Sequence, residues 1–268
     1  MTTPLTTGNG RLKDTRKLSR RSVRSERRLF LADGPKAVEG ALSVPGCVVE
    51  VFATPAATEQ YAGLATEAVE VPWTLVDDRA LASLSDSVSP AGVVALCRHL
   101  DRPLDDLLST PRRLVALCAD VRDPGNAGTV VRCADAAGVE VVVLAGSSVD
   151  AYNPKTVRAS VGSLFHVPVA VEPDAAAAVR AARAAGLTVL AADGAGEVDL
   201  FEADELLTRP TAWLFGNEAW GLPDELAALA DHRVRIPIHG RAESLNLSTA
   251  AALCLYASAR AQRRTLQE

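Results

Sequence analysis

The sequence predicts an α/β protein with two domains, of which the C-terminal one contains a parallel sheet. Short apolar runs alternate with helix-like stretches along the 268 residues, a pattern typical of strands joined by crossover helices. In the second half the strand runs are continuously apolar, which indicates strands buried on both faces of a sheet. The length and the composition, 48% hydrophobic and 23% charged, suit two globular domains.

The N-terminal half predicts a smaller α/β domain over residues 13–99. Residues 1–12 are expected to form a disordered tail, because the first ten are mostly small and polar. A helical pattern follows to about residue 41, with Asp33-Gly34-Pro35 as a turn and helix start. Further elements are expected as strands at 47–53, 72–76 and 92–97 and helices at 56–66 and 78–84. Residues 100–112, with two prolines and several charges, form the expected linker.

Residues 113–268 predict the parallel-sheet domain. The expected strands are 114–119, 139–144, 165–171, 187–192, 212–215 and 234–238, and the expected helices are 127–137, 174–185 and 246–264. Gly138 and Gly186 end two of these helices. Ligands of open α/β sheets bind at the carboxyl ends of the strands. Three polar segments follow strands there, at 122–132, 216–222 and 238–248, and they are expected to converge.

Positive charge is concentrated near the N-terminus. Between Arg11 and Arg28 nine Lys or Arg residues oppose two acids, so this stretch carries +7 and the rest of the chain −12. A basic arm of this kind suits contacts to nucleic-acid phosphates, and a solvated tail is the open alternative. The residues expected to contact RNA are Arg16, Lys17, Arg20, Arg21, Arg24 and Arg27.

Several protein classes are disfavoured. No apolar run reaches the length of a membrane span, and the charged N-terminus does not lead into a signal peptide. The five cysteines and four histidines show no CxxC, HExxH or similar spacing, which argues against a disulfide framework or a metal site. A cytoplasmic protein without membrane association or metal is therefore expected.

Each of the three polar segments also has a purely structural interpretation. The first, from Asp123 to Arg132, places glycines at a helix start that could bind an anion, yet Arg132 alone resembles any exposed helix arginine. In the second, Glu218 could simply cap a helix at 223–230, and Trp220 could be a core anchor. In the third, Ser244 or Asn246 could cap the last helix.

Taken together, however, residues 123–138, 214–222 and 236–251 resemble the three motifs of the SpoU/TrmH family of RNA ribose 2′-O-methyltransferases. Asn153-Pro-Lys155 and the stretch from Arg158 to Ser163 resemble the same family, and the likeness covers 113–264. Residues 14–97 are similar to the ribosomal-protein-like RNA-binding domain that often precedes this catalytic domain. Ala219 stands where glycine is frequent in the family, which should not disturb the chemistry.

The resemblance implies a knotted methyltransferase domain with a deep trefoil knot, a homodimer, and S-adenosylmethionine as the cofactor. Its substrate would be a structured RNA, with ribosomal RNA preferred over transfer RNA because of the N-terminal domain. The cofactor contacts that it implies are Leu214, Gly216, Ile236, Ile238, Leu245 and Asn246. The catalytic residues that it implies are Asn126, Arg132, Glu218, Ser244 and Asn246.

Arg132 is the base proposed for the family, but a free guanidinium is effectively always protonated. We therefore expect Arg132 to bind the phosphate beside the target ribose and to stabilise developing alkoxide charge, with Glu218 orienting Arg132 or the ribose. Two other classes stay open: a nucleotide-cofactor oxidoreductase, disfavoured by the missing GxGxxG motif, and a non-catalytic RNA-binding protein with a degenerate methyltransferase domain.

Overall fold

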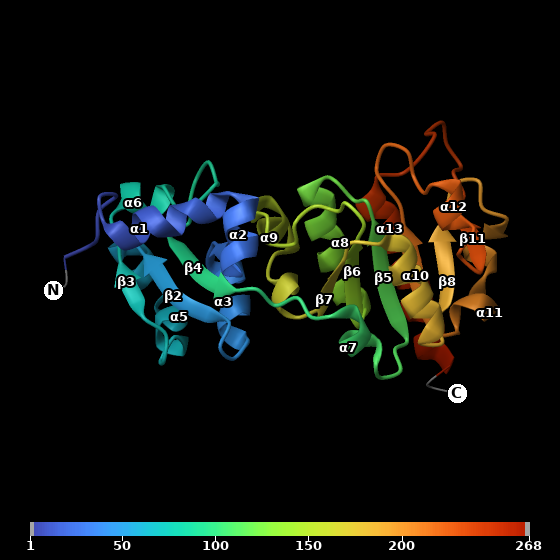
Figure 1. Ribbon diagram of the computed structural model, residues 1–268, viewed down its shortest axis with the longest axis horizontal. Helices are drawn as coiled ribbons and strands as arrows, with labels where there is room; N and C mark the ends of the chain where they lie inside the picture. Colours follow the sequence, from blue (N-terminus) through green and yellow to red (C-terminus); the bar gives the residue numbers. More distant parts are fainter. Residues whose placement is uncertain (1–2, 266–268) are drawn as a thin grey trace. The chain divides into compact units, whose positions relative to one another are not determined.

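The computed structural model describes residues 3–265, which divide into two compact units (Figure 1). Unit 1 contains residues 3–100 together with Asp150–His166, and unit 2 contains Asp101–Val149 and residues 167–265. The segment from 150 to 166 therefore packs with the N-terminal unit, although it lies inside the range expected for the methyltransferase domain.

Unit 1 is built on a four-stranded mixed sheet in the order β1-β4-β2-β3. Strand β4 is antiparallel to both β1 and β2, whereas β3 runs parallel to β2. The strands are β1 (Leu29–Asp33), β2 (Val48–Ala53), β3 (Trp73–Leu75) and β4 (Val93–Arg98). The helices of unit 1 are α1 (Gly10–Thr15), η1 (Arg16–Ser19), α2 (Arg21–Arg27), α3 (Pro35–Ser43), α4 (Pro55–Gln60), α5 (Ala62–Glu67), α6 (Asp78–Ala82), α9 (Pro154–Ser160) and η2 (Ser163–Phe165).

Two expectations for the start of the chain are wrong. Residues 29–33 form strand β1 and not part of a helix, because they pair along their length with β4 and bury Phe30 completely. The tail is not disordered over residues 3–12. The N–H of Leu5 donates to the carbonyl of Leu75 at 2.8 Å, and Leu12 on α1 is fully buried. Residues 1 and 2 of the expected tail lie outside the described residues.

An aromatic cluster explains why residues 150–166 belong to unit 1. The rings of Phe30 and Tyr152 lie 4.6 Å apart, and Phe165 stacks on Phe30 at 6.1 Å. The Tyr152 hydroxyl accepts a hydrogen bond from the N–H of Leu100 at 2.6 Å. Burial of three large rings stabilises the fold substantially, so it fixes this segment against the first sheet.

Unit 2 is built on a seven-stranded sheet in the order β7-β6-β5-β10-β8-β11-β9, and all of its neighbouring strands are parallel. The strands are β5 (Leu114–Ala119), β6 (Val141–Ala145), β7 (Val169–Glu172), β8 (Thr188–Ala192), β9 (Val198–Asp199), β10 (Thr211–Phe215) and β11 (His232–Arg235). The helices are α7 (Leu104–Leu108), α8 (Pro124–Ala137), α10 (Ala175–Ala184), η3 (Leu200–Glu202), α11 (Asp204–Leu207), α12 (Asp224–Ala227) and α13 (Leu247–Thr265).

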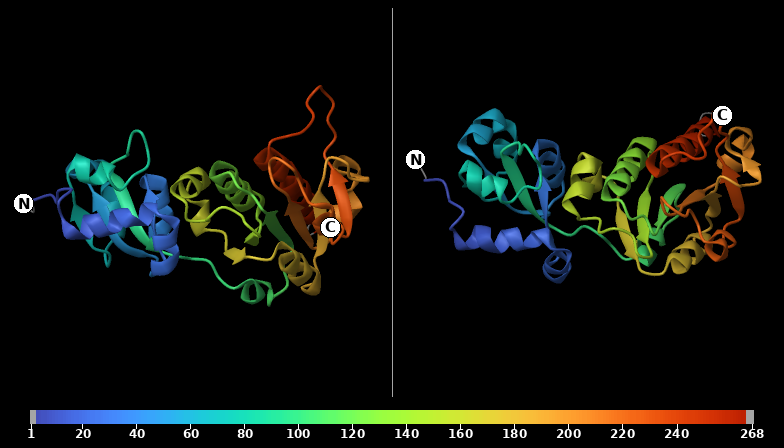
Figure 2. Two further views of the ribbon diagram at one scale, coloured as in Figure 1. Left: turned by 45° about the horizontal axis from the view of Figure 1, so that its top comes forward. Right: turned by 90° about the horizontal axis from the view of Figure 1, so that it is seen from above.

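The sheet of unit 2 is covered on both faces, as its apolar strands predict. Helices α8 and α13 pack together on one face, and α7 and α10 cover the other (Figure 2). Strands β5 and β10 are buried along their whole length. Inside this core the indole N–H of Trp213 donates to the Ser258 hydroxyl at 2.9 Å, which ties α13 to the sheet. Among residues 3–265 no helix has the length and hydropathy needed to span a bilayer.

Candidate active site

The three polar segments of unit 2 meet at the carboxyl ends of its central strands. Asn126 stands between the other two segments: its Nδ2 donates to Oε1 of Glu218 at 3.2 Å, and its Oδ1 accepts from Nδ2 of Asn246 at 3.0 Å. The partners lie 92 and 120 residues away along the chain. Direct hydrogen bonds therefore join side chains that the sequence placed in three separate motifs.

Glu218 binds the start of helix α8. Its carboxylate accepts from the backbone N–H groups of Arg122 at 3.1 Å and Asp123 at 3.0 Å, in addition to Asn126. Asp123 is itself the N-cap, accepting from the N–H of Asn126 at 2.8 Å. Partial burial raises the pKa of Glu218, but the N–H donors outweigh it and hold the pKa below its ordinary value of 4.5. The carboxylate is thus ionised and oriented.

The loop after β10 is held by its backbone and by Asn217. Asn217 is buried, its Nδ2 donates to the carbonyl of Asp120 at 2.6 Å, and its backbone exchanges two 2.9 Å hydrogen bonds with Gly221. A Cβ at Gly216 would lie only 2.4 Å from the carbonyl carbon and oxygen of Gly221. The expected contact residue Gly216 is therefore required by close backbone approach.

The loop between β11 and α13 extends away from the sheet (Figure 2). Within the described chain, residues 238–245 make no backbone–backbone hydrogen bond. Ile236 and Leu245 are partly buried, and Ile238 is 38% exposed. Asn246 ends the loop by capping α13, with its Oδ1 accepting from the N–H of Ser248 at 2.9 Å. The loop therefore offers free peptide groups beside apolar side chains.

Three of the expected site residues stand apart from this network. Arg132 is exposed on α8, six residues or about 9 Å of helix beyond Asn126, and no hydrogen bond or ion pair joins it to another described residue. Glu218 was expected to orient Arg132 or the ribose; within one chain it binds the start of α8, and no contact among the described residues joins it to Arg132. Ser244 is exposed and bonded to none of the described residues. Leu214 is buried in the core of the sheet.

Other residues of the site were not expected from the sequence. Asp120 adopts a left-handed conformation with φ 55° and accepts from the N–H of Ser147 at 2.7 Å. Trp220 is no core anchor, since it is 58% exposed and its ring lies 5.9 Å from the Arg122 guanidinium carbon, a cation–π arrangement. The only indication of these residues in the sequence was that two glycines, Gly216 and Gly221, flank a polar and aromatic stretch.

Burial and the charge of Glu218 raise the pKa of the Cys118 thiol to about 12, so this thiol stays protonated.

The basic arm of unit 1 is ordered, and its residues differ in their surroundings. Arg24 is 2% exposed, its guanidinium lies 2.7 Å from Oδ2 of Asp150, and it donates to the carbonyl of Leu18 at 2.7 Å. This burial removes Arg24 from the residues that can reach a phosphate. The other expected contacts are more accessible: Arg27 and Lys17 pair with Asp14, Arg16 donates to the carbonyl of Thr7, and Arg20 and Arg21 are exposed.

The parallel sheet, the glycine-rich loop after β10 and the three joined segments agree with the methyltransferase domain that the sequence motifs predicted. The model of the SpoU rRNA Methylase family matches residues 113–256, and that of the MRM3-like substrate binding domain matches residues 9–95. The chain belongs to the SpoU rRNA methylase family.

Known relatives extend over nearly the whole chain. The Bacillus subtilis 23S rRNA (guanosine(2553)-2′-O)-methyltransferase RlmP is 33% identical over 251 residues, covering 92% of this chain and 95% of its own. An AdoMet-bound rRNA methyltransferase from Sinorhizobium meliloti has a TM-score of 0.84 at 33% identity, covering 96% and 97% of the two chains. AviRb from Streptomyces viridochromogenes, also solved with AdoMet, has a TM-score of 0.83 at 31% identity, covering 96% and 100%.

Proposed function

We propose that this chain transfers the methyl group of S-adenosylmethionine to the 2′-hydroxyl of a ribose in 23S ribosomal RNA. The observation that carries the proposal is the joining of three motif loops through Asn126, Glu218 and Asn246 at the carboxyl edge of a parallel sheet. The names of RlmP and of the solved rRNA methyltransferases support ribosomal RNA as the substrate. Because ribosomal RNA is the substrate, we assign the reaction to the cytoplasm.

The loops fit S-adenosylmethionine. Gly216 leaves no room for a side chain beside Gly221, and residues 238–245 offer peptide groups without backbone partners. Such groups can bind the adenine, ribose and amino-acid parts of the cofactor, while Ile236, Ile238 and Leu245 supply apolar contacts. When bound, the cofactor supplies an activated methyl group on a sulfonium.

The chain itself has to align the hydroxyl and help it lose a proton. We assign Arg132 to the phosphate beside the target ribose, where its charge stabilises the developing alkoxide. Asn126, Glu218 and Asn246 hold the loop geometry around the ribose, and Ser244 lies on the loop that would face it. The proton is then accepted by a phosphate oxygen or by water.

Arg132 is exposed and distant from Asn126 within one chain, which favours an active site completed in a homodimer. Helix α13 supports this arrangement, because Leu253 and Tyr256 are 38% and 51% exposed on it. Such apolar exposure on a helix suits a protein–protein interface. We therefore propose a homodimer whose α13 helices pack together, and the trefoil knot of the family in unit 2.

The decisive test replaces Arg132 by alanine. We expect methyl transfer to unmodified 23S rRNA, transcribed in vitro, to fall by roughly 10²–10³, while S-adenosylmethionine affinity measured by calorimetry stays within about twofold. Arg180→Ala, which removes an exposed arginine on α10, is the matched control and should keep full activity. Joint loss of cofactor affinity and activity in Arg132→Ala would contradict the role given to Arg132. Mapping ribose methylation in a deletion strain against its parent identifies the nucleotide.

A further inference from the structure

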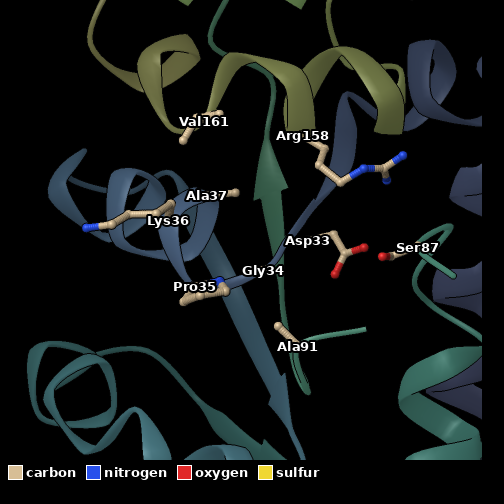
Figure 3. A pocket seen from close by; sticks show the side chains of 9 residues that line it. All are labelled: Asp33, Gly34, Pro35, Lys36, Ala37, Ser87, Ala91, Arg158 and Val161. Carbon is tan, nitrogen blue, oxygen red and sulfur yellow. The ribbon is translucent and has the colours of Figure 1, made fainter. Parts of the chain in front are cut away.

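Unit 1 contains a hollow of about 200 Å³ beside the start of α3 (Figure 3). The charged side chains that line it all have partners: Asp33 accepts from the Ser85 hydroxyl, Arg158 pairs with Asp86, and Lys36 pairs with Glu39. In Figure 3 the Lys36 ammonium also points away from Asp33. These satisfied charges leave little in the hollow for a ligand to bind. An uncovered aromatic ring beside the candidate active site of unit 2 offers more.

The turn from Asn217 to Gly221 holds the side chain of Trp220 outside the core. Two backbone hydrogen bonds of 2.9 Å between Asn217 and Gly221 close the turn, and Oδ1 of Asn217 accepts from the N–H of Ala219 at 2.8 Å. Gly221 supplies the left-handed φ of 68° at its end. Trp220 is therefore 58% exposed on an ordered turn. Such a turn needs no indole, and exposing one forgoes the free energy of burying it.

Arg122 approaches this indole from a second segment of the chain. Its guanidinium carbon lies over the ring, 5.9 Å from the ring centroid, in a cation–π arrangement. Its backbone N–H donates to Oε2 of Glu218 at 3.1 Å, which ties the start of α8 to the same turn. Within residues 3–265 neither the Arg122 guanidinium nor the Trp220 indole N–H has a hydrogen-bond or ion-pair partner. The pair therefore presents a planar ring and unused donors together.

The surroundings of Trp220 favour a nucleobase over a protein partner. Glu218, Ala219, Gly221 and Arg122 are all exposed, so the indole is a single large apolar group among charged and small residues. Protein interfaces are marked by contiguous apolar patches, and these residues do not form one. An aromatic ring beside an arginine is instead a combination on which unpaired bases stack.

We propose that Trp220 and Arg122 form a stacking site for an unpaired nucleobase of the RNA, next to the ribose that receives the methyl group. This inference rests on the proposed methyltransferase function. Glu218 in the same turn accepts from Nδ2 of Asn126 at 3.2 Å, so the indole neighbours the side chains that we assign to the ribose. Every base has a face that can stack on the ring. The contact therefore tolerates any base but selects an unpaired one.

The test compares Trp220→Ala, Trp220→Leu and Trp220→Phe in the full-length protein, with Phe201→Ala as the matched control. Phe201 lies on η3, outside the three loops, and is 57% exposed. The probe is 23S rRNA transcribed in vitro. The alanine and leucine variants lose the stacking ring, so we expect the KM for RNA to rise roughly tenfold while kcat and cofactor affinity stay near those of the wild type. The phenylalanine variant should keep most of the RNA affinity. The salt dependence of RNA binding should not change, because stacking releases no counterions.

Fluorescence reports the same contact directly. Trp213 is fully buried, and Trp73 is partly buried with its indole N–H donating to the Thr58 hydroxyl. In a Trp73→Phe protein, Trp220 is therefore the exposed tryptophan, and RNA should protect its emission from quenching by acrylamide. A protein that carries both Trp73→Phe and Trp220→Phe should show no such protection.

The proposal is overturned if Trp220→Ala or Trp220→Leu has the same KM for RNA as Phe201→Ala. It is also overturned if Trp220→Ala loses S-adenosylmethionine affinity in calorimetry, which would assign the indole to the cofactor. Dissociation of Trp220→Ala into a smaller species in light scattering overturns it as well, because the indole would then belong to a protein interface. Each of these results, obtained with an active wild-type enzyme, leaves the methyltransferase function intact. A wild-type protein that methylates no ribose in the RNA refutes the proposed function instead, so the two failures are distinct.

Discussion

Replacing Glu218 by glutamine tests how the candidate active site is held together. The Glu218 carboxylate accepts three N–H donors at 3.0–3.2 Å at the start of α8. Glutamine keeps the shape of the side chain but loses the charge and turns an amide NH₂ toward a backbone N–H. At least one donor at the helix start then loses its partner in the protein. The substitution should therefore destabilise unit 2 and loosen the loop that carries Gly216.

The size of the effect follows from the contacts. Hydrogen bonds to a charged group contribute about 1 kcal/mol more than neutral ones, and a carboxylate at a helix N-terminus contributes about 0.5 kcal/mol through the helix dipole. Glu218 is exposed, so water replaces part of the loss. We expect a destabilisation of about 1.5 kcal/mol, which corresponds to a decrease in melting temperature of roughly 3–6 °C.

Thermal denaturation at neutral pH measures this decrease, and methyl transfer should weaken in parallel. Glu243→Gln is the matched control, because Glu243 is exposed on the loop after β11 and bonds to none of the described residues. If Glu218→Gln melts at the same temperature as Glu243→Gln, the carboxylate does not hold the start of α8 and the reasoning is refuted.

The same contacts predict a pH dependence. The folded protein holds the pKa of Glu218 below its ordinary value of 4.5, so the carboxylate stabilises the fold fully above that pH. This stabilisation is lost as the pH falls through the lowered pKa of the folded state. The difference in melting temperature between wild type and Glu218→Gln should therefore be largest at neutral pH and shrink below about pH 4.5. A difference that grows on acidification contradicts this sign.

Further substitutions probe other parts of the molecule. Gly216→Ala places a Cβ 2.4 Å from the carbonyl of Gly221. This substitution should lower the free energy of unfolding by about 1–3 kcal/mol and abolish S-adenosylmethionine binding in calorimetry. Unchanged binding would show that the loop can shift. Arg24→Ala leaves Asp150 without its 2.7 Å partner and should destabilise unit 1 by about 3–5 kcal/mol in denaturant unfolding. Arg20→Ala, at an exposed position, should change the free energy of unfolding by less than about 0.5 kcal/mol. Equal effects of Arg24→Ala and Arg20→Ala would contradict the buried ion pair.

The sequence was sufficient for features that depend on local pattern. Continuously apolar runs such as 114–119 predicted strands buried on both faces, and the structure has β5 there. Gly138 predicted the end of α8, since a left-handed C-cap acts within one helical turn, and Gly138 has φ 80°. The start was predicted at residue 127, whereas α8 begins at Pro124 after the N-cap Asp123. The convergence of three polar segments followed from a general property of parallel sheets, because the carboxyl ends of their strands share one edge.

Tertiary structure alone decided which side chains became partners. Arg24 and Arg20 look alike in the sequence, yet Arg24 is buried against Asp150, 126 residues away, and Arg20 stays exposed. Residues 29–33 match a helical pattern but form a strand, because pairing with β4 outweighs a weak local preference. The periodicity of charged and apolar residues can be read from the sequence, but the surroundings of each residue come from distant segments. Those surroundings determine whether the residue supports the fold or remains available to RNA.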